Sequence, residues 1–101
     1  MNSKRKGNNG ERELCQYLND HGIPAHRNDQ RCILGGLDNP DISIDGYHVE
    51  VKRTEQFRLY DAMNQAIRDA NGHAVPVVVH RRNKSGWVAV LRIDDFIRLL
   101  K

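Results

Sequence analysis

Polar and apolar residues alternate along residues 41–44 and again along residues 47–52, and Asp45-Gly46 separates the two runs. Strict alternation predicts half-buried β-strands. Asp-Gly between two such runs is typical of a two-residue type I′ turn. The pattern therefore predicts a β-hairpin whose register is set by the turn.

The predicted register gathers charged side chains on one face of the hairpin. Asp41 lies directly opposite Glu50, and Lys52 follows on the same face because side chains alternate with a period of two. The opposite face is apolar and carries Ile42, Ile44, Val49 and Val51. Opposed carboxylates repel, and a divalent cation such as Mg²⁺, which takes carboxylate oxygens and water, removes that repulsion. The alternative is an exposed face whose charges are unrelated.

The rest of the chain predicts three helices and three further strands. Helical spacing of apolar residues predicts helices that span residues 8–21, 59–71 and 93–100. Strand patterns cover residues 23–28, 74–80 and 87–91. The run 74–80 is almost continuously apolar, which is typical of a strand buried on both faces. Residues 29–39 read as a loop, so the order α-β-β-β-α-β-β-α predicts an α/β mixed sheet flanked by helices.

Glu11 stands out in the first predicted helix. It precedes Leu14, Cys15 and Leu18 by three, four and seven residues, so it falls in the middle of the apolar stripe. Two interpretations follow. Asn8 and Glu11 fit a capping box at the start of the helix. Together with the hairpin, Glu11 is also a candidate third carboxylate, and the two roles are compatible.

Composition narrows the class of protein. The 101 residues suffice for a single domain, predicted to span residues 1–101 with a flexible basic arm at 1–7. A net charge of +3 is compatible with nucleic acid, although net charge alone favours a solvated surface of mixed charge. The two cysteines form no C-x-x-C motif, no metal-ligand spacing with the histidines suggests zinc, and no segment has membrane-spanning length. These features predict an intracellular protein with free thiols.

The acid in the first helix, Pro40-Asp41 and Glu50-Val51-Lys52 together resemble the PD-(D/E)xK nuclease superfamily. Within it, the chain resembles the small, phage-type Holliday junction resolvases over nearly its whole length. Further segments that resemble this family are Gly10 to Leu14, Arg27, residues 59–66, residues 76–82 and Trp87.

The resemblance implies a restriction-endonuclease-like fold and a Mg²⁺-dependent endonuclease that resolves four-way DNA junctions in recombination or replication. The implied catalytic residues are Glu11, Asp41, Glu50, Lys52 and Gln65. The implied ligands of Mg²⁺, for which Mn²⁺ can substitute, are Asp41, Glu50, the Val51 carbonyl and Glu11 itself or through water. Lys52 is expected to orient water or stabilise the phosphate. Gln65 is expected to assist, although its helical position lies away from the apolar stripe.

The implied partner is branched double-stranded DNA, in the cytoplasm of a bacterium or a phage-infected host, with no membrane and no nucleotide cofactor. Residues expected to hold the DNA backbone are Lys4, Arg5, Lys6, Arg12, Arg27, Arg31, Arg53 and Arg58. Cutting two strands symmetrically implies a C2 homodimer. His48 shares the face of Glu50, and a structural or phosphate-contacting role is favoured over a ligand or base. Alternatives are a small phage nuclease acting on nicked or flapped DNA, a catalytically silent DNA-binding module, and an unrelated α/β domain.

Overall fold

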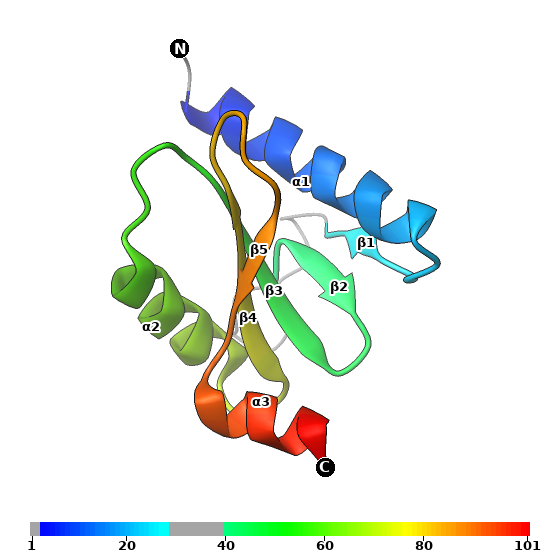
Figure 1. Ribbon diagram of the computed structural model, residues 1–101, viewed down its shortest axis with the longest axis vertical. Helices are drawn as coiled ribbons and strands as arrows, with labels where there is room; N and C mark the ends of the chain where they lie inside the picture. Colours follow the sequence, from blue (N-terminus) through cyan, green and yellow to red (C-terminus); the bar gives the residue numbers. More distant parts are fainter. Residues whose placement is uncertain (1–2, 29–39) are drawn as a thin grey trace.

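The computed structural model describes residues 3–28 and 40–101, with side chains from Asn9 onward in the first range. The elements follow the predicted order (Figure 1): α1 (Ser3–Asp20), β1 (His26–Arg27), β2 (Ile42–Ile44), β3 (Tyr47–Arg53), α2 (Leu59–Ala70), β4 (Val75–Arg81), β5 (Val88–Val90) and α3 (Ile93–Leu100). The predicted loop at 29–39, which includes Arg31, lies outside the described residues. No helix in the described ranges is both long and apolar enough to cross a membrane.

The five strands form one mixed sheet in the order β1-β2-β3-β4-β5. Only β3 and β4 pair in parallel, because α2 carries the chain back between them; the other neighbours are antiparallel. In the hairpin, Ile42 pairs with Val49 and Ile44 pairs with Tyr47. The predicted register and the predicted α/β mixed sheet are therefore both confirmed.

The turn of this hairpin differs from the prediction. Gly46 has φ +84°, but Asp45 is not among the non-glycine residues with positive φ. A type I′ turn requires positive φ at both central residues, so the predicted turn type is wrong. The two-residue loop still sets the register. The Gly46 carbonyl also accepts a hydrogen bond from the Val75 N–H at 3.0 Å, which ties the turn to the start of β4.

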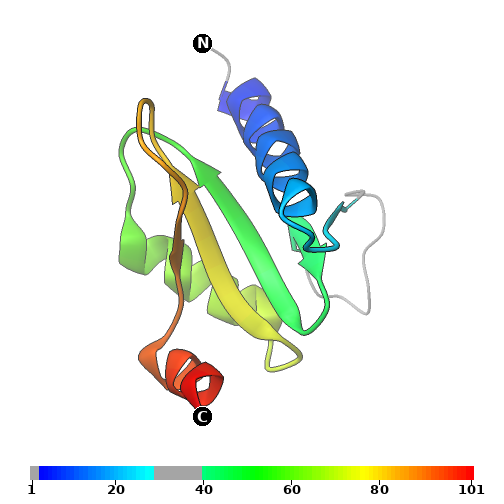
Figure 2. The same ribbon diagram turned by 45° about the vertical axis from the view of Figure 1, so that its right-hand side comes forward.

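Helices cover the two faces of the sheet, with α1 on one side and α2 on the other (Figure 2). The buried core on the α1 side comprises Leu14, Ala25, Ile42, Val49 and Val51. The buried core on the α2 side comprises Ala62, Met63, Ala66 and Val78. Because side chains alternate along β3, Val49 and Val51 face α1, while His48, Glu50 and Lys52 face α2. The polar face of one central strand is thus enclosed beside a helix.

Two predicted segment boundaries are wrong. The first helix begins at Ser3 rather than at Asn8 or Asn9, so residues 3–7 of the predicted basic arm are helical. Lys and Arg are good helix formers, which favours this extension. The strand expected at 23–28 pairs only through His26 and Arg27. Asn19 explains part of this, because its side-chain amide hydrogen-bonds both the N–H and the carbonyl of Ala25 and satisfies them outside the ladder.

The strand β4 is less enclosed than its sequence predicts. Val78 is completely buried under α2, but Val77 and Val79 on the other face are only half-buried. They line an apolar groove between α1 and α3, because α1 covers β1 to β3 and leaves this part of the sheet partly open. The prediction of burial on both faces therefore holds for only one face.

Candidate active site

The hairpin brings Asp41 and Glu50 together as its register requires. Asp41 directly precedes β2, and one of its carboxylate oxygens, Oδ2, accepts a hydrogen bond from the Val51 N–H at 2.8 Å. The Asp41 and Glu50 side chains are hydrogen-bonded to each other. A hydrogen bond between two carboxyl groups requires a proton on one of them. The pair therefore shares a proton only at pH values below the raised pKa of Asp41.

The electrostatics of Asp41 follow from this contact. Burial, and then the negative charge of Glu50, raises the pKa of Asp41 from its ordinary value of 3.8 to about 7. The Val51 N–H and the Lys52 ammonium lower this pKa but do not offset the rise. The Lys52 ammonium is a smaller influence than burial and the Glu50 charge, so the site carries an excess of negative charge that a bound cation would relieve.

Glu11 is the third acid at this site, and Gly10 allows it to be there. A Cβ atom on Gly10 would lie 2.6 Å from Cβ of Arg53, so only glycine lets α1 approach β3 this closely. Burial raises the pKa of Glu11, as does the charge of Asp41, while Arg27 at 3.6 Å lowers it. The helix begins at Ser3, so Asn8 is not its N-cap and the capping interpretation of Glu11 is wrong.

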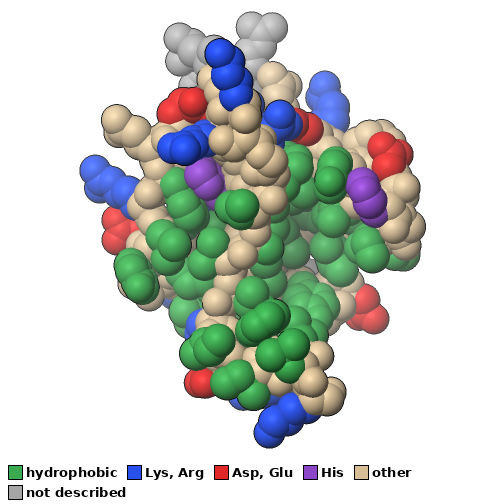
Figure 3. All heavy atoms as spheres, viewed as in Figure 1, with side chains coloured by type: hydrophobic (Ala, Val, Ile, Leu, Met, Phe, Trp, Pro, Cys, Tyr) green, Lys and Arg blue, Asp and Glu red, His purple; other side chains and the backbone are tan. Residues whose placement is uncertain are grey.

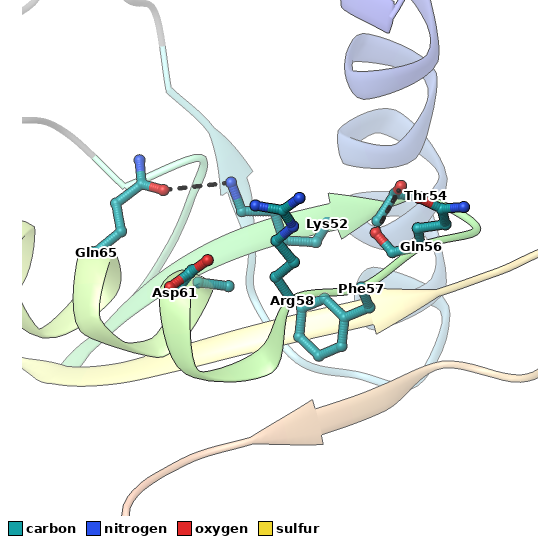
Figure 4. Close-up of a pocket in the computed structure, with 8 residues that line it drawn as sticks. Lys52, Thr54, Gln56, Phe57, Arg58, Asp61 and Gln65 are labelled. Atoms are coloured by element: carbon teal, nitrogen blue, oxygen red, sulfur yellow. Dashed lines mark hydrogen bonds between the residues drawn. The ribbon is translucent and has the colours of Figure 1, made fainter.

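Lys52 and Gln65 meet across the space between β3 and α2. The Lys52 Nζ donates a hydrogen bond to Gln65 Oε1 at 3.4 Å (Figure 4). Gln65 lies off the apolar stripe of α2, yet the polar face of β3 extends beside that stripe and receives it. A cavity of about 270 Å³ opens beside the pair. It is lined by Lys52, Thr54, Gln56, Phe57, Arg58, Asp61, Ala62 and Gln65.

His48 and Asp69 complete the polar layer between β3 and α2. His48 is only 4% exposed, and its Nε2 lies 2.7 Å from Oε1 of Glu50. Asp69 approaches the same two residues from α2. Sequence reasoning missed Asp69, although its place one helical turn after Gln65 was an available signal.

Comparisons with known proteins place the fold. No family model and no curated protein sequence matches the chain. Among solved structures, it is similar to Hjc from Archaeoglobus fulgidus, a Holliday junction resolvase from an archaeal hyperthermophile. The TM-score is 0.64 at 22% sequence identity, and the match covers 84% of this chain and 76% of Hjc.

The chain has the fold of Hjc. The restriction-endonuclease-like architecture expected from the sequence is therefore confirmed. The likeness concerns the path of the backbone, and the residues that carry chemistry in this chain are argued from its own contacts.

Within this Hjc-like fold, the basic residues expected to hold DNA fall into three groups. Arg12 and Arg58 are exposed, and Arg58 borders the cavity beside Lys52. Arg27 is partly exposed and pairs with Glu11. The side chains of Lys4, Arg5 and Lys6, like Arg31, lie outside the described part of the chain.

Arg53 is enclosed in a network that ties the ends of β3 and β4 to α1. Its guanidinium lies 3.8 Å from Glu13, 3.6 Å from Glu55 and 2.9 Å from the side chain of Asn83. Glu13 also pairs with Arg81. These contacts give Arg53 a structural role, and its role in DNA binding stays a prediction. Sequence reasoning did not single out Glu13, because its partners come from distant strands.

Proposed function

We propose that this chain is a divalent-metal-dependent endonuclease that cuts branched DNA, with the four-way junction as its substrate. The contact between Asp41 and Glu50, with the charge of Glu11 acting on Asp41 and with Lys52 next along β3, carries the proposal. Acids brought together without enough basic partners destabilise a fold, so such an arrangement favours a function that needs them. The fold of Hjc, which is a Holliday junction resolvase, supports the junction as the substrate.

The donor set fits a hard divalent cation. Asp41 and Glu50 supply carboxylate oxygens at one position, Glu11 adds a third near Asp41, and the Val51 carbonyl belongs to the same strand. Oxygen donors in an incomplete shell are typical of Mg²⁺ and Mn²⁺ sites that also take a phosphate. When bound there, the cation supplies an acidified water and stabilisation of negative charge on the phosphate.

The neighbouring side chains assign the remaining roles. Lys52 places an ammonium next to the acids, where it can orient the attacking water and stabilise charge that develops on the phosphate. The hydrogen bond from Lys52 to Gln65 fixes the position of that ammonium. Gln65 therefore acts as a positioning residue. Arg58, at the mouth of the adjacent cavity, is placed to hold a backbone phosphate of the same DNA strand.

The test is cleavage of a labelled four-way junction beside a linear duplex with the same arm sequences, in Mg²⁺, in Mn²⁺ and in EDTA. We expect paired, symmetric cuts in the junction alone, with both metal ions and not in EDTA. Equal cutting of both substrates would retain the nuclease and overturn the selectivity for junctions. Tight junction binding without cutting under any condition would favour the catalytically silent binding module instead.

We also propose that the active unit is a homodimer. Symmetric cutting of two strands needs two active sites, and the described residues of one chain form a single acidic cluster of this kind. Figure 3 shows hydrophobic side chains gathered over α3 and the adjoining part of the sheet. Exposed apolar residues on α3 are Ile93, Phe96, Ile97, Leu99 and Leu100. Leu99 also lines the groove over Val77 and Val79, so this continuous apolar surface is suited to a second copy of the chain.

Sedimentation measurements on Leu99→Asp test the dimer. We expect the wild-type chain to sediment as a dimer and the variant as a folded monomer that still binds one DNA arm. Val88→Asp is the matched control, because Val88 is equally exposed but lies on the sheet face opposite the groove. A Leu99→Asp variant that remains dimeric would place the interface elsewhere.

A further inference from the structure

A second cluster of possible metal ligands lies on the side of Glu50 that faces α2. His48 and Glu50 are two residues apart on β3, so both side chains point to the same face. Both are more than nine-tenths buried, with exposed fractions of 4% and 6%. Their facing atoms, His48 Nε2 and Glu50 Oε1, are 2.7 Å apart. A buried imidazole is therefore held directly against a buried carboxylate.

The helix α2 supplies a third donor to this cluster. One ligand atom from each of His48, Glu50 and Asp69 can be chosen so that all three lie within 4.8 Å of one another. No other group of three such residues is found in the described part of the chain. Asp69 follows Gln65 by one helical turn, so α2 presents Gln65 to Lys52 and Asp69 to the His48–Glu50 pair.

The chemistry of this cluster differs from that of the acids around Asp41. It offers one imidazole nitrogen and two carboxylates, a donor set that suits Zn²⁺, Mn²⁺ or Ni²⁺ better than Mg²⁺. Bonds of about 2.0–2.2 Å would place neighbouring donor atoms roughly 3 Å apart around such an ion. The His48–Glu50 separation of 2.7 Å is close to this value, and the Asp69 oxygen, which lies within 4.8 Å of both ligand atoms, would move inward to complete the arrangement.

We propose that His48, Glu50 and Asp69 form a binding site for a divalent transition-metal cation, separate from the oxygen-lined position at Asp41. Glu50 belongs to both positions, because it contacts His48 through Oε1 and is also hydrogen-bonded to Asp41. The proposal does not depend on nuclease activity, since the ligands are defined by geometry alone.

Titration of the full-length chain with Zn²⁺, followed by NMR of the histidine side chains, tests the site. We expect the Nε2 resonance of His48 to shift and to reach its limit near one ion per chain. Millimolar Mg²⁺ should leave that shift in place, because Mg²⁺ disfavours nitrogen ligands. A His48 resonance that ignores Zn²⁺ while the exposed histidines respond would overturn the proposal. So would displacement of Zn²⁺ by Mg²⁺ in equal amounts.

Two variants assign the ligands by calorimetry with Zn²⁺. Asp69→Asn removes one charged donor from a partly exposed position and is expected to weaken Zn²⁺ binding at least about tenfold. His48→Gln is a second variant that keeps a polar side chain in the buried position. Asp94→Asn, an exposed acid on α3, is the control and should bind Zn²⁺ like the wild type. Equal affinity in Asp69→Asn and the wild type would contradict the assignment.

Because neither readout uses DNA, the metal site and the proposed nuclease can fail independently. A chain that binds Zn²⁺ at His48 but cuts no DNA would retain this inference and remove the proposed function. A chain that cuts junctions but shows no response to Zn²⁺ at His48 would retain the proposed function and remove this inference.

Discussion

Asp41 and Asp95 are both withdrawn from solvent, yet their surroundings are opposite in charge. Asp95 is 3% exposed, and its carboxylate lies 3.0 Å from Nε of Arg92 and 2.7 Å from Nη1 of Arg98. Both arginines belong to α3 or its N-cap, so the charge is balanced locally. Asp41 instead faces another carboxyl group at Glu50, and Glu11 adds a third.

We propose that this difference separates a structural acid, Asp95, from a functional one, Asp41. At Asp95 the chain places two cations around one anion, and the arrangement is complete without a ligand. At Asp41 the chain places carboxyl groups together, and we propose that a bound cation neutralises their negative charge. A buried acid is therefore informative when its neighbours fail to compensate it. The predictions below change one side of this contrast at a time.

Among variants that keep all the acidic residues, Lys52→Ala is expected to have the largest effect on the cleavage rate. Loss of a preorganised cation beside the reacting phosphate should lower the cleavage rate by about 10²–10³-fold. Junction affinity should change little, since the other basic residues remain. Single-turnover cleavage and gel-shift titration measure the two quantities, with Lys101→Ala as an exposed control. A rate within a few fold of the wild type would remove Lys52 from the proposed mechanism.

Breaking the compensated site should change stability and leave cleavage alone. Asp95→Asn removes the charge that two arginines surround and should lower the free energy of unfolding by about 1–3 kcal/mol. Urea denaturation measures the loss. The adjacent exposed variant Asp94→Asn should lie within about 0.5 kcal/mol of the wild type. If Asp95→Asn instead slowed cleavage without destabilising the fold, Asp95 would be a functional acid and the proposed contrast with Asp41 would be wrong.

The pH dependence of stability should carry the signature of Asp41. In the folded chain its pKa is about 7 against an ordinary 3.8, so between these values the folded state holds a proton that the unfolded state has released. The free energy of unfolding therefore falls as pH rises from about 4 to 7. In EDTA at pH 8, Asp41→Asn should then be more stable than the wild type, by roughly 1–2 kcal/mol.

Added Mg²⁺ should reduce that difference, because the cation stabilises the ionised wild-type pair and has less to bind in the variant. Thermal melts of the wild type and of Asp41→Asn at pH 5 and pH 8, with and without Mg²⁺, give the difference in stability under each of the four conditions. The opposite slope, with the wild type gaining stability relative to Asp41→Asn as pH rises in EDTA, would show that Asp41 is a compensated acid like Asp95.

The smallest effect is expected from Gln65→Ala. Its hydrogen bond to Lys52 is a single contact at 3.4 Å. A net contribution of about 1 kcal/mol corresponds to about a fivefold lower cleavage rate. Asn64→Ala, at the exposed neighbouring position, is the control. Because Gln65 acts through Lys52, the double variant with Lys52→Ala should be no slower than Lys52→Ala alone.

The parts of the fold that sequence predicts well depend on contacts between near neighbours in the chain. The register of the hairpin follows from a two-residue loop, and it alone places Asp41 against Glu50. The helical position of Glu11 follows from its spacing to Leu14 and Leu18. These local rules were sufficient to assemble the candidate site, because most of its side chains lie on one hairpin and one helix.

The parts that sequence reasoning missed depend on contacts between distant segments. Glu13 was not singled out, because its partners Arg53 and Arg81 lie at the ends of two strands far from it in the sequence. Asp69 could be connected with His48 and Glu50 only from the fold, because α2 lies against the polar face of β3. The Asp45-Gly46 turn also has a distant contact that its sequence does not reveal, since the Gly46 carbonyl accepts a hydrogen bond from Val75 at the start of β4.

The most direct test of the central claim is single-turnover cleavage of a four-way junction by Asp41→Asn under saturating protein and Mg²⁺. Asparagine keeps a side-chain oxygen that can accept the Val51 N–H, so the hairpin should stay intact while the uncompensated acid is lost. We predict junction binding at least as tight as that of the wild type, with cleavage reduced about 10³-fold or more, in line with the several kcal/mol that a bound metal ion supplies. Cleavage at the wild-type rate by a folded, junction-bound Asp41→Asn chain would contradict the claim that these acids form the catalytic metal site.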